Sequence, residues 1–237
     1  MDLYYDLHMH SCLSPCGDDD MTPYNLVNMA KIMGLDIIAL TDHNSCGNCR
    51  AAMEAGAEAG ITVVPGMELC TSEEVHNVCL FPEIDAAERF WRYVQTKLPP
   101  IKNKVKIFGN QYYMDARDNI LGSEEILLNT GAFISETELL PLVAGYGGFC
   151  WPAHIDRSSY SIVSQLGVID ESFGFTAAEI YDRTKTEELK ERFPVLNDML
   201  ILHNSDAHYL ENIKEPLDVI DLPENTPAAL ITALKAL

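Results

Sequence analysis

Two pairs of side chains near opposite ends of the chain have the residue types and spacing of metal ligands. His8 and His10 flank a methionine close to the start, and Asp206 and His208 flank an alanine close to the end. Because alternate side chains of an extended strand point to the same face, each pair should present both side chains on one side. Imidazoles and carboxylates bind divalent transition metals. The two pairs therefore predict a metal site built from both ends of the sequence.

Between these two pairs, further candidate ligands each stand at the end of an apolar stretch of the sequence. Any one of these histidines alone is better explained as a buried or loop residue with an ordinary hydrogen-bond partner. Six of the seven histidines lie at or beside expected strand ends, however, and that concentration favours a shared site. We predict a polynuclear metal centre whose ligands include His8, His10, His43, Glu68, His76, His154, Asp206 and His208.

Composition limits the fold and the partners. A chain of 237 residues that is 47% hydrophobic suits one domain, residues 1–237, with one sizeable core. The formal net charge of −20 argues against binding to long duplex nucleic acid and to anionic membrane surfaces. A phosphorylated substrate is still compatible, since bound divalent ions can invert the local potential.

The start of the chain and its cysteines indicate the compartment. The first residues lack a basic and apolar leader, and no apolar run approaches the ~20 residues needed to span a bilayer. The seven cysteines are scattered and odd in number. Together these features predict a cytoplasmic protein.

Apolar stretches and helix signals alternate in a β-α-β order. Expected strands cover residues 4–10, 36–41, 61–65, 147–153, 177–181 and 199–204, and expected helices cover 23–34, 50–59 and 226–237. With ligands at the ends of the strands, this order predicts an α/β barrel whose strand-end face holds the chemistry.

Residues 85–144 interrupt the alternation. A helix over 86–97, a hairpin within 104–121 and a helix opened by the capping pair Ser135 and Glu138 are expected there. Because this insertion lies between two ligand motifs, we expect it to form a cap over the site.

In order, spacing and local context these motifs resemble the PHP (polymerase and histidinol phosphatase) family, over essentially the whole chain apart from the insertion. The resemblance implies a distorted (β/α)7 barrel with a trinuclear metal centre that hydrolyses phosphoesters. It also implies three ligand groups: His8, His10, Glu68 and Asp206 on one ion; Glu68, His76 and His154 on a second; and His43, His208 and one acid of the first loop on a third.

The first loop departs from the short Ser-Asp-Gly pattern of that family, because residues 15–17 lengthen it. Asp18, Asp19 and Asp20 are therefore all candidates for the loop ligand. Counting back from Pro23 favours Asp18. The other two aspartates are then expected to be solvated in front of a helix N-terminus, where negative charge is favoured.

The donor set suggests both the metal and the reaction. Imidazoles with carboxylates suit two or three ions of Mn, Zn or Fe, and Glu68 can bridge two of them. Close ions lower the pKa of a shared water and neutralise charge on a phosphoryl oxygen. We therefore expect attack of metal-bound hydroxide on phosphorus, with Glu68 as a catalytic residue as well as a ligand.

Cationic side chains for a phosphate are few, with sixteen Lys plus Arg in all. Arg157, three residues after His154, is best placed to bind phosphate in bidentate fashion. Arg183, just beyond the expected strand 177–181, comes next. Arg117 in the insertion is better explained as a surface ion-pair partner.

Other interpretations remain open. Cys12, Cys16, Cys46 and Cys49 follow two strand ends and could gather as a zinc or iron–sulfur site with a redox or sensing role. An amidohydrolase that cleaves C–N bonds would use a similar barrel, although no plausible carbamylated lysine is present.

Three further side chains have a choice of roles. Asp6 and Asp42 are candidates to orient ligand imidazoles or to bind backbone N–H groups. His203 is expected to be structural. Within the resemblance, the partner is a small phosphorylated substrate such as a phosphomonoester, a nucleotide or a short oligonucleotide end, and no feature of the sequence specifies an oligomeric state.

Overall fold

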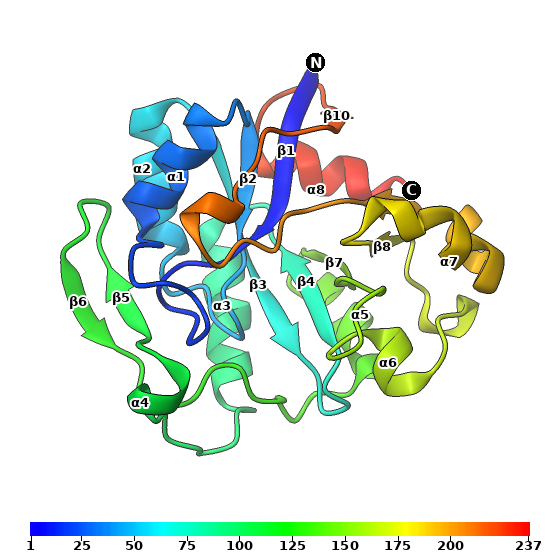
Figure 1. The fold of residues 1–237 in the computed structure, drawn as a ribbon, viewed down its shortest axis with the longest axis horizontal. Coiled ribbons are helices and arrows are strands. Elements are labelled where there is room, and N and C mark those ends of the chain that lie inside the picture. Colours follow the sequence, from blue (N-terminus) through cyan, green and yellow to red (C-terminus); the bar gives the residue numbers. More distant parts are fainter.

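A curled sheet forms the centre of the protein in a computed structural model that describes all residues 1–237 (Figure 1). Its strands are β1 (Asp2–Met9), β2 (Ile37–Leu40), β3 (Thr62–Cys70), β4 (His76–Leu80), β7 (Phe149–Pro152), β8 (Ala177–Glu179), β9 (Leu200–Leu202) and β10 (Val219–Asp221). Six of them hydrogen-bond in the order β10-β1-β2-β3-β4-β7, and β8 pairs with β9.

The sheet closes through isolated backbone contacts. The N–H of Ile155, just after β7, donates to the carbonyl of Glu179 in β8 (2.9 Å). The N–H of His10, just after β1, donates to the carbonyl of Ala207, which follows β9 (2.9 Å). Seven strands, β1-β2-β3-β4-β7-β8-β9, thus form the distorted barrel that was predicted, while β10 adds antiparallel to β1 outside it.

Strand β4 runs against its neighbours. It is antiparallel to both β3 and β7, whereas β1, β2 and β3 are parallel. The sequence placed His76 at the end of an apolar run, but His76 is the first residue of β4. Because the direction is reversed, the amino end of β4 lies at the same rim as the carboxyl ends of the other strands.

Helices cover the sheet, and most of them begin or end at the predicted signals. They are α1 (Pro23–Ile32), α2 (Cys49–Ala59), α3 (Ile84–Gln95), α4 (Val105–Phe108), α5 (Glu136–Gly145), α6 (Ile162–Leu166), α7 (Thr186–Arg192) and α8 (Pro227–Lys235). The Thr22 side chain caps α1 by accepting from the N–H of Asn25, and Gly60 ends α2 with a left-handed φ of 74°. No helix combines the length and apolar character that crossing a bilayer requires.

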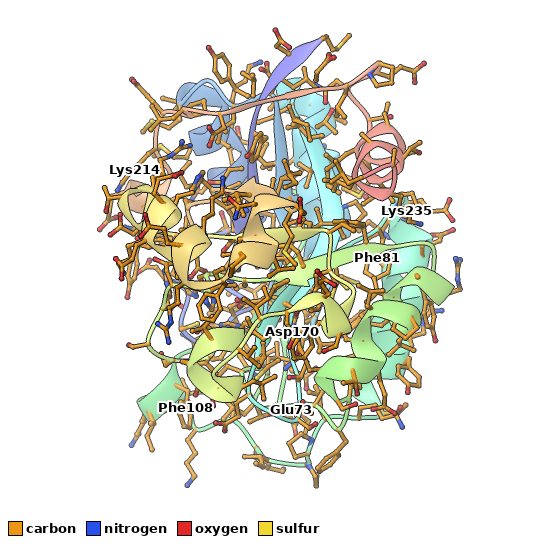
Figure 2. The ribbon with its side chains drawn as sticks, turned by 90° about the vertical axis from the view of Figure 1, so that its right-hand side faces the viewer. Glu73, Phe81, Phe108, Asp170, Lys214 and Lys235 are labelled. Carbon is orange, nitrogen blue, oxygen red and sulfur yellow. The ribbon has the colours of Figure 1, made fainter.

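Hydrophobic side chains pack on both faces of the sheet. In β2, Ile38 and Leu40 belong to a cluster that includes residues of α1, α2 and α3, whereas Ile37 and Ala39 belong to a second cluster that includes Leu230 of α8. Phe81, just after β4, is fully buried and contacts Phe90 of α3 with ring centroids 5.1 Å apart. In Figure 2 it lies among helices on one side of the molecule. This two-sided packing fixes the strand ends that carry the candidate ligands.

The insertion packs beside the first loop. Its hairpin consists of β5 (Tyr112–Met114) and β6 (Ile120–Ser123) and projects from one side of the molecule (Figure 1). The N–H of Tyr112 donates to the carbonyl of Cys12 (3.0 Å), and the Tyr113 ring lies against Gly47. The hairpin therefore buttresses two of the loops that follow strands.

Candidate metal centre

Eight side chains converge at one rim of the barrel. They come from the ends of strands or from the residues just after them, except His76, which begins β4. The N–H of His10 is tied to the carbonyl of Ala207, so that the two ends of the chain meet there. The eight are His8, His10, His43, Glu68, His76, His154, Asp206 and His208, all buried except His208, which is half-buried.

Glu68 lies at the middle of the cluster. Its Oε1 is 2.9 Å from His76 Nδ1, 3.0 Å from His154 Nε2 and 3.2 Å from His8 Nε2. Its Oε2 is 2.8 Å from His43 Nδ1 and 3.5 Å from His10 Nε2. A carboxylate that offers its two oxygens to different groups of imidazoles is suited to bridge two ions.

Three sets of ligand atoms are close enough to share an ion. Within each set the atoms lie within 4.8 Å of one another, and the sets share residues. They are His8, His10 and Glu68; His43, Glu68 and His76; and His10, His43 and His208. Asp206 joins the first set, with its Oδ1 3.1 Å from His10 Nε2 and 3.5 Å from His8 Nε2.

Many atoms of the cluster have no hydrogen-bond partner. Five buried atoms make no hydrogen bond of acceptable geometry, although two of them, His43 Nδ1 and Glu68 Oε2, lie 2.8 Å apart. The five are His43 Nδ1, Glu68 Oε2, His76 Nε2, His154 Nδ1 and Asp206 Oδ1. Leaving a buried polar atom unsatisfied costs about 1–3 kcal/mol, so five of them in one place would be expensive without a further partner. The lone pairs of these nitrogen and oxygen atoms fit divalent transition-metal ions.

A carboxylate that the sequence analysis overlooked orients His8. Glu179 Oε1 lies 2.9 Å from His8 Nδ1, while Asn204 Nδ2 donates to Glu179 Oε2 (2.7 Å). The backbone N–H of His154 also donates to Glu179 Oε1 (3.1 Å). With Nδ1 engaged, Nε2 of His8 is left facing the cluster. An acidic residue inside the otherwise apolar strand β8 was the available signal.

His10 is oriented through a serine. Its Nδ1 lies 3.0 Å from Ser14 Oγ, and that hydroxyl donates to Asp42 Oδ1 (2.7 Å). Asp42 therefore acts on a ligand indirectly. Asp6 instead accepts the backbone N–H groups of His8 (3.3 Å) and Ser205 (3.2 Å).

Charges within the cluster stabilise one another. Burial by itself lowers the pKa of His8, but Glu179, Asp206 and Glu68 together raise it well above its usual value. Burial raises the pKa of Glu68, yet His76, His8 and His43 bring it well below its usual value. Glu68 is thus held as a carboxylate, the form that binds cations.

Two of the candidate ligands have a left-handed backbone. His154 has φ 31° and Asp206 has φ 49°, and neither is glycine. Such conformations are unfavourable for most residues and are typical of functional sites. His154 lies two residues after β7, and Asp206 lies four residues after β9.

The first loop gives its acids other partners. Asp18 Oδ1 accepts the N–H of Asp20 (2.9 Å), and the Asp19 carboxylate accepts from Asn110 Nδ2 (2.8 Å). Asp18, Asp19 and Cys16 all lie outside the three sets of ligand atoms. Besides Ser14, the loop brings Cys16 to the cluster, with its Sγ 3.1 Å from His43 Nε2.

The four thiols that could have formed a separate site have different neighbours. Cys12 Sγ contacts Met114 Sδ (3.6 Å), and Cys49 Sγ lies 3.4 Å from the carbonyls of Leu40 and Gly66. Cys16 instead contacts His43. Cys46 adjoins Cys49, but Cys12 and Cys16 have other neighbours, so the structure does not bring the four together.

The cluster opens into a cavity of about 220 Å³. Arg157 lies at its edge, where its Nη1 donates to Asp206 Oδ2 (2.8 Å) and its guanidinium covers the Tyr181 ring at 4.3 Å. Tyr160 stacks on the His76 ring from the same side (4.7 Å between centroids). Of the insertion, Asn129 is the residue that lines this cavity.

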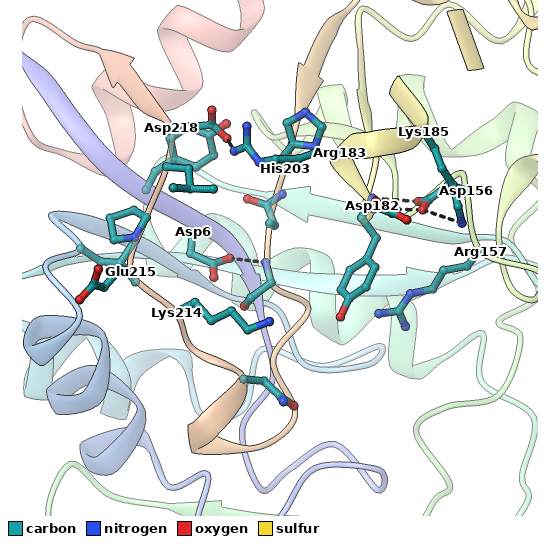
Figure 3. A pocket seen from close by; sticks show the side chains of 18 of the residues that line it. Asp6, Asp156, Arg157, Asp182, Arg183, Lys185, His203, Lys214, Glu215 and Asp218 are labelled. Atoms are coloured by element: carbon teal, nitrogen blue, oxygen red, sulfur yellow. Dashed lines mark hydrogen bonds and ion pairs between the residues drawn. The ribbon is translucent and has the colours of Figure 1, made fainter. Parts of the chain in front are cut away.

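A second cavity of about 770 Å³ adjoins the first, and Arg157 and Ser159 line both. It is lined by four cations, Arg157, Arg183, Lys185 and Lys214. Figure 3 shows Arg183 directed at Asp218 and Lys185 at Asp156.

The remaining predicted residues lie apart from the cluster. His203 lines the second cavity, and its Nδ1 donates to the carbonyl of Ile180 (2.7 Å). Arg117 is exposed and makes no ion pair, unlike the surface pairing that was expected, because the nearby Asp115 carboxylate is occupied by backbone N–H groups and by Asn119.

Two curated relatives align with about 30% of the chain. A 5′-3′ exoribonuclease of Haemophilus influenzae is 37% identical over 70 residues, which are 30% of this chain and 24% of that protein. A 3′,5′-nucleoside bisphosphate phosphatase of Chromobacterium violaceum is 36% identical over 73 residues, 31% of this chain and 25% of that protein. The chain thus spans about a quarter of the length of each.

Solved structures share the fold over the whole chain. A lesion-specific endonuclease from Pyrococcus furiosus superposes with a TM-score of 0.71 at 15% identity, covering 100% of this chain and 56% of that one. Endonuclease Q in complex with a 27-mer duplex containing an abasic lesion gives a TM-score of 0.68 at 16% identity, covering 100% and 57%. The PHP domain profile matches residues 6–157, which carry most of the ligand cluster. The chain is a member of the PHP domain family.

Proposed function

We propose that this protein is a metal-dependent phosphoesterase that releases phosphate from a small phosphomonoester, a nucleotide or the end of an oligonucleotide. The observation that carries the proposal is the cluster around Glu68, where five buried imidazole and carboxylate atoms lack partners. A guanidinium stands beside that cluster, at the edge of a cavity of about 220 Å³. Family membership supports the same reaction class.

The candidate ligands would hold two or three divalent ions of Mn, Zn or Fe. His8, His10, Glu68 and Asp206 supply one group of donors, His76 and His154 extend it across Glu68, and His43 and His208 supply the last. When bound, such ions would lower the pKa of a water molecule and neutralise charge on a phosphoryl oxygen.

The protein's own residues supply the remaining functions. Glu179 and Ser14 fix the ring orientations of His8 and His10, so the donor atoms are in place before substrate arrives. Arg157 has guanidinium N–H groups beyond the one given to Asp206 and can donate them to phosphate oxygens. Tyr160, stacked on His76 and 40% exposed, offers a ring face to a base or sugar.

The second cavity would take the rest of the substrate. It shares Arg157 with the metal cavity, and Arg183 lies on its wall as a secondary phosphate contact. Its four cations face five acidic residues, Asp6, Asp156, Asp182, Glu215 and Asp218. This balance favours a substrate with one or two phosphates and polar groups over a long polyanion.

Phosphate release from a panel of substrates tests the proposal. Purified protein is loaded with Mn²⁺, Zn²⁺ or Fe²⁺ and given nitrophenyl phosphate, bis(nitrophenyl) phosphate, a nucleoside bisphosphate, a short single strand and a duplex with an abasic site. We expect metal-dependent hydrolysis of a monoester or a chain end, lost after chelation. Internal cleavage of the duplex alone would overturn the assignment of a small substrate.

A pair of histidine variants separates the cluster from the rest of the protein. His8→Ala combined with His10→Ala should lose bound metal and phosphatase activity while keeping the fold. His203→Ala removes the one histidine outside the cluster and should keep the metal content of the parent protein. Activity that persists in the double variant would locate the reaction elsewhere.

A further inference from the structure

The first loop places the Cys16 thiol beside His43 and His208, the pair of ligands for which no third donor has been identified. His43 and His208 need another donor, and two acids of the loop have other contacts: Asp18 accepts the N–H of Asp20, and Asp19 accepts from Asn110. Cys16 Sγ lies 3.1 Å from His43 Nε2 and also faces the His208 imidazole. It lines the same cavity as both histidines. We propose that Cys16 is a thiolate ligand of a metal ion shared with His43 and His208.

The inference rests on the proposed metal centre and names its chemistry. His10, His43 and His208 already place ligand atoms within 4.8 Å of one another, and the thiol adjoins this set. Zn–N and Zn–S bonds of about 2.0 and 2.3 Å allow two ligands of one ion to lie up to about 4.3 Å apart. The observed 3.1 Å is within that reach. His43 is 4% exposed, and its Nδ1 lies 2.8 Å from Glu68 Oε2, so Nε2 is the ring nitrogen that faces Cys16.

The loop backbone holds the thiol in this position. The N–H of Asp18 donates to the carbonyl of His208 (2.9 Å), and the N–H of His43 donates to Ser14 Oγ (3.2 Å). Both candidate ligands are thus tied to the loop on either side of Cys16. A side chain at Gly17 would collide with the Ser11 carbonyl, 2.6 Å from an added Cβ, so the tight turn requires glycine.

A thiolate changes which ion is preferred. Carboxylate ligands suit Mn²⁺ and Mg²⁺, whereas a sulfur ligand favours softer ions such as Zn²⁺ or Fe²⁺. The lengthened loop thus replaces the loop acid of the family pattern by a cysteine. The ion held by His43, His208 and Cys16 is therefore a soft divalent metal.

Cobalt absorption tests the ligand directly. Metal-free protein is titrated with Co²⁺, and the visible ligand-field bands and near-ultraviolet sulfur-to-cobalt charge-transfer band are recorded. We expect both in the parent protein, loss of only the charge-transfer band in Cys16→Ser and Cys16→Asp, and no change in Asp18→Asn. Ligand-field bands without a charge-transfer band in the parent would overturn the thiol ligand and leave the proposed function standing. Absence of cobalt binding would overturn both.

Thiol reactivity gives a second readout that needs no variant. Cys16 is exposed and the other six cysteines are buried, so one thiol should react quickly with Ellman's reagent in the native metal-free protein. Saturating Zn²⁺ should slow that reaction, because a coordinated thiolate is both occupied and covered. An equal rate with and without Zn²⁺ would contradict the inference.

Measurements of metal affinity test whether Cys16 binds the ion or only lies beside it. Cys16→Asp should weaken Zn²⁺ binding at one site by at least the about 10–100-fold that loss of an outer partner costs. The same variant should bind Mn²⁺ at least as well as the parent protein. Unchanged Zn²⁺ affinity in competition with a chromogenic chelator would contradict the inference.

Discussion

Single side chains decide the chemistry of this rim, and Glu68 is the most connected of them. Five imidazoles lie within 3.5 Å of its two carboxylate oxygens. Neutralising this one group would remove the common partner of all five. The hydrogen-bond partners of the ligands matter as much as the ligands themselves. A neutral imidazole has only one unprotonated nitrogen, and the partner of the other nitrogen decides which one can bind a metal ion.

Glu179→Gln should weaken metal binding while the fold is kept. The amide can still accept from Asn204, but it no longer offers a charged acceptor to His8 Nδ1. Loss of such a partner typically costs about 10–100-fold in metal affinity, and competition with a chelator would measure it. Glu187→Gln, on the exposed side of α7, is the matched control. Equal metal affinities for the two variants would refute this role for Glu179.

Arg157→Ala should reduce kcat/KM on a phosphomonoester by about 10- to 150-fold, the equivalent of losing a charged hydrogen bond worth about 1.5–3 kcal/mol. Arg157→Lys should recover only part of the loss, since an ammonium cannot donate in bidentate fashion. Arg192→Ala, whose guanidinium lies over Phe193, serves as the control. A kcat/KM unchanged from the parent in Arg157→Ala would remove this residue from the site.

The residues that can be predicted from the sequence are those whose type and local spacing indicate a shared site. His8 and His10 share a strand, so their common orientation could be predicted. Glu179 and Cys16 meet the cluster only through contacts across the barrel and along a lengthened loop. Neither contact produces a periodic pattern in the sequence, and both are seen only in the three-dimensional structure.

At the level of elements, the main departure is the direction of β4. Alternation of strands and helices predicts parallel strands, and most of the barrel follows it. Between β3 and β4, however, there are only five residues, too few for a helical crossover. The strands must then be antiparallel, which brings His76 to the rim from the amino end. Short elements such as α6 and β10 were also missed, because a few residues carry little periodicity.

Helix α5 carries an acid that should make stability depend on pH. Glu136 is 2% exposed, and burial raises its pKa to about 7, although Asn77 donates to its Oε2 (2.9 Å). In the unfolded chain the Glu136 carboxyl ionises with its usual pKa of 4.5. Because the folded pKa is the higher one, the free energy of unfolding should fall between about pH 4.5 and 7 and stay lower above.

Glu136→Gln should therefore stabilise the protein at alkaline pH. A pKa of about 7 in the folded protein against 4.5 in the unfolded chain corresponds to up to about 3 kcal/mol at pH 8, and the advantage should vanish near pH 4. Urea unfolding at several pH values measures the difference. Glu191→Gln, an exposed control, should leave the profile unchanged. A Glu136→Gln profile parallel to that of the parent would refute the role of this carboxyl.

For the whole molecule, the ions should act as a stabilising ligand. Ions present at 100 times their Kd stabilise the folded state by about 2.7 kcal/mol. At about 2–4 °C per kcal/mol for a chain of this size, chelation should lower Tm by about 5–11 °C. The His8→Ala, His10→Ala double variant should show little change on chelation. An equal shift in both proteins would mean that the stabilising ions bind elsewhere.

The meeting of His10 with Ala207 has a consequence for synthesis. His8 and His10 precede Asp206 and His208 in the sequence, so they leave the ribosome about 200 residues earlier. Synthesis adds about 5–20 residues per second, so about 10–40 s pass between the synthesis of His8 and His10 and that of Asp206 and His208. During that interval the nascent chain exposes an incomplete set of imidazoles to whatever metal the cell offers. The ion retained in the finished protein is then chosen only when the last ligands arrive.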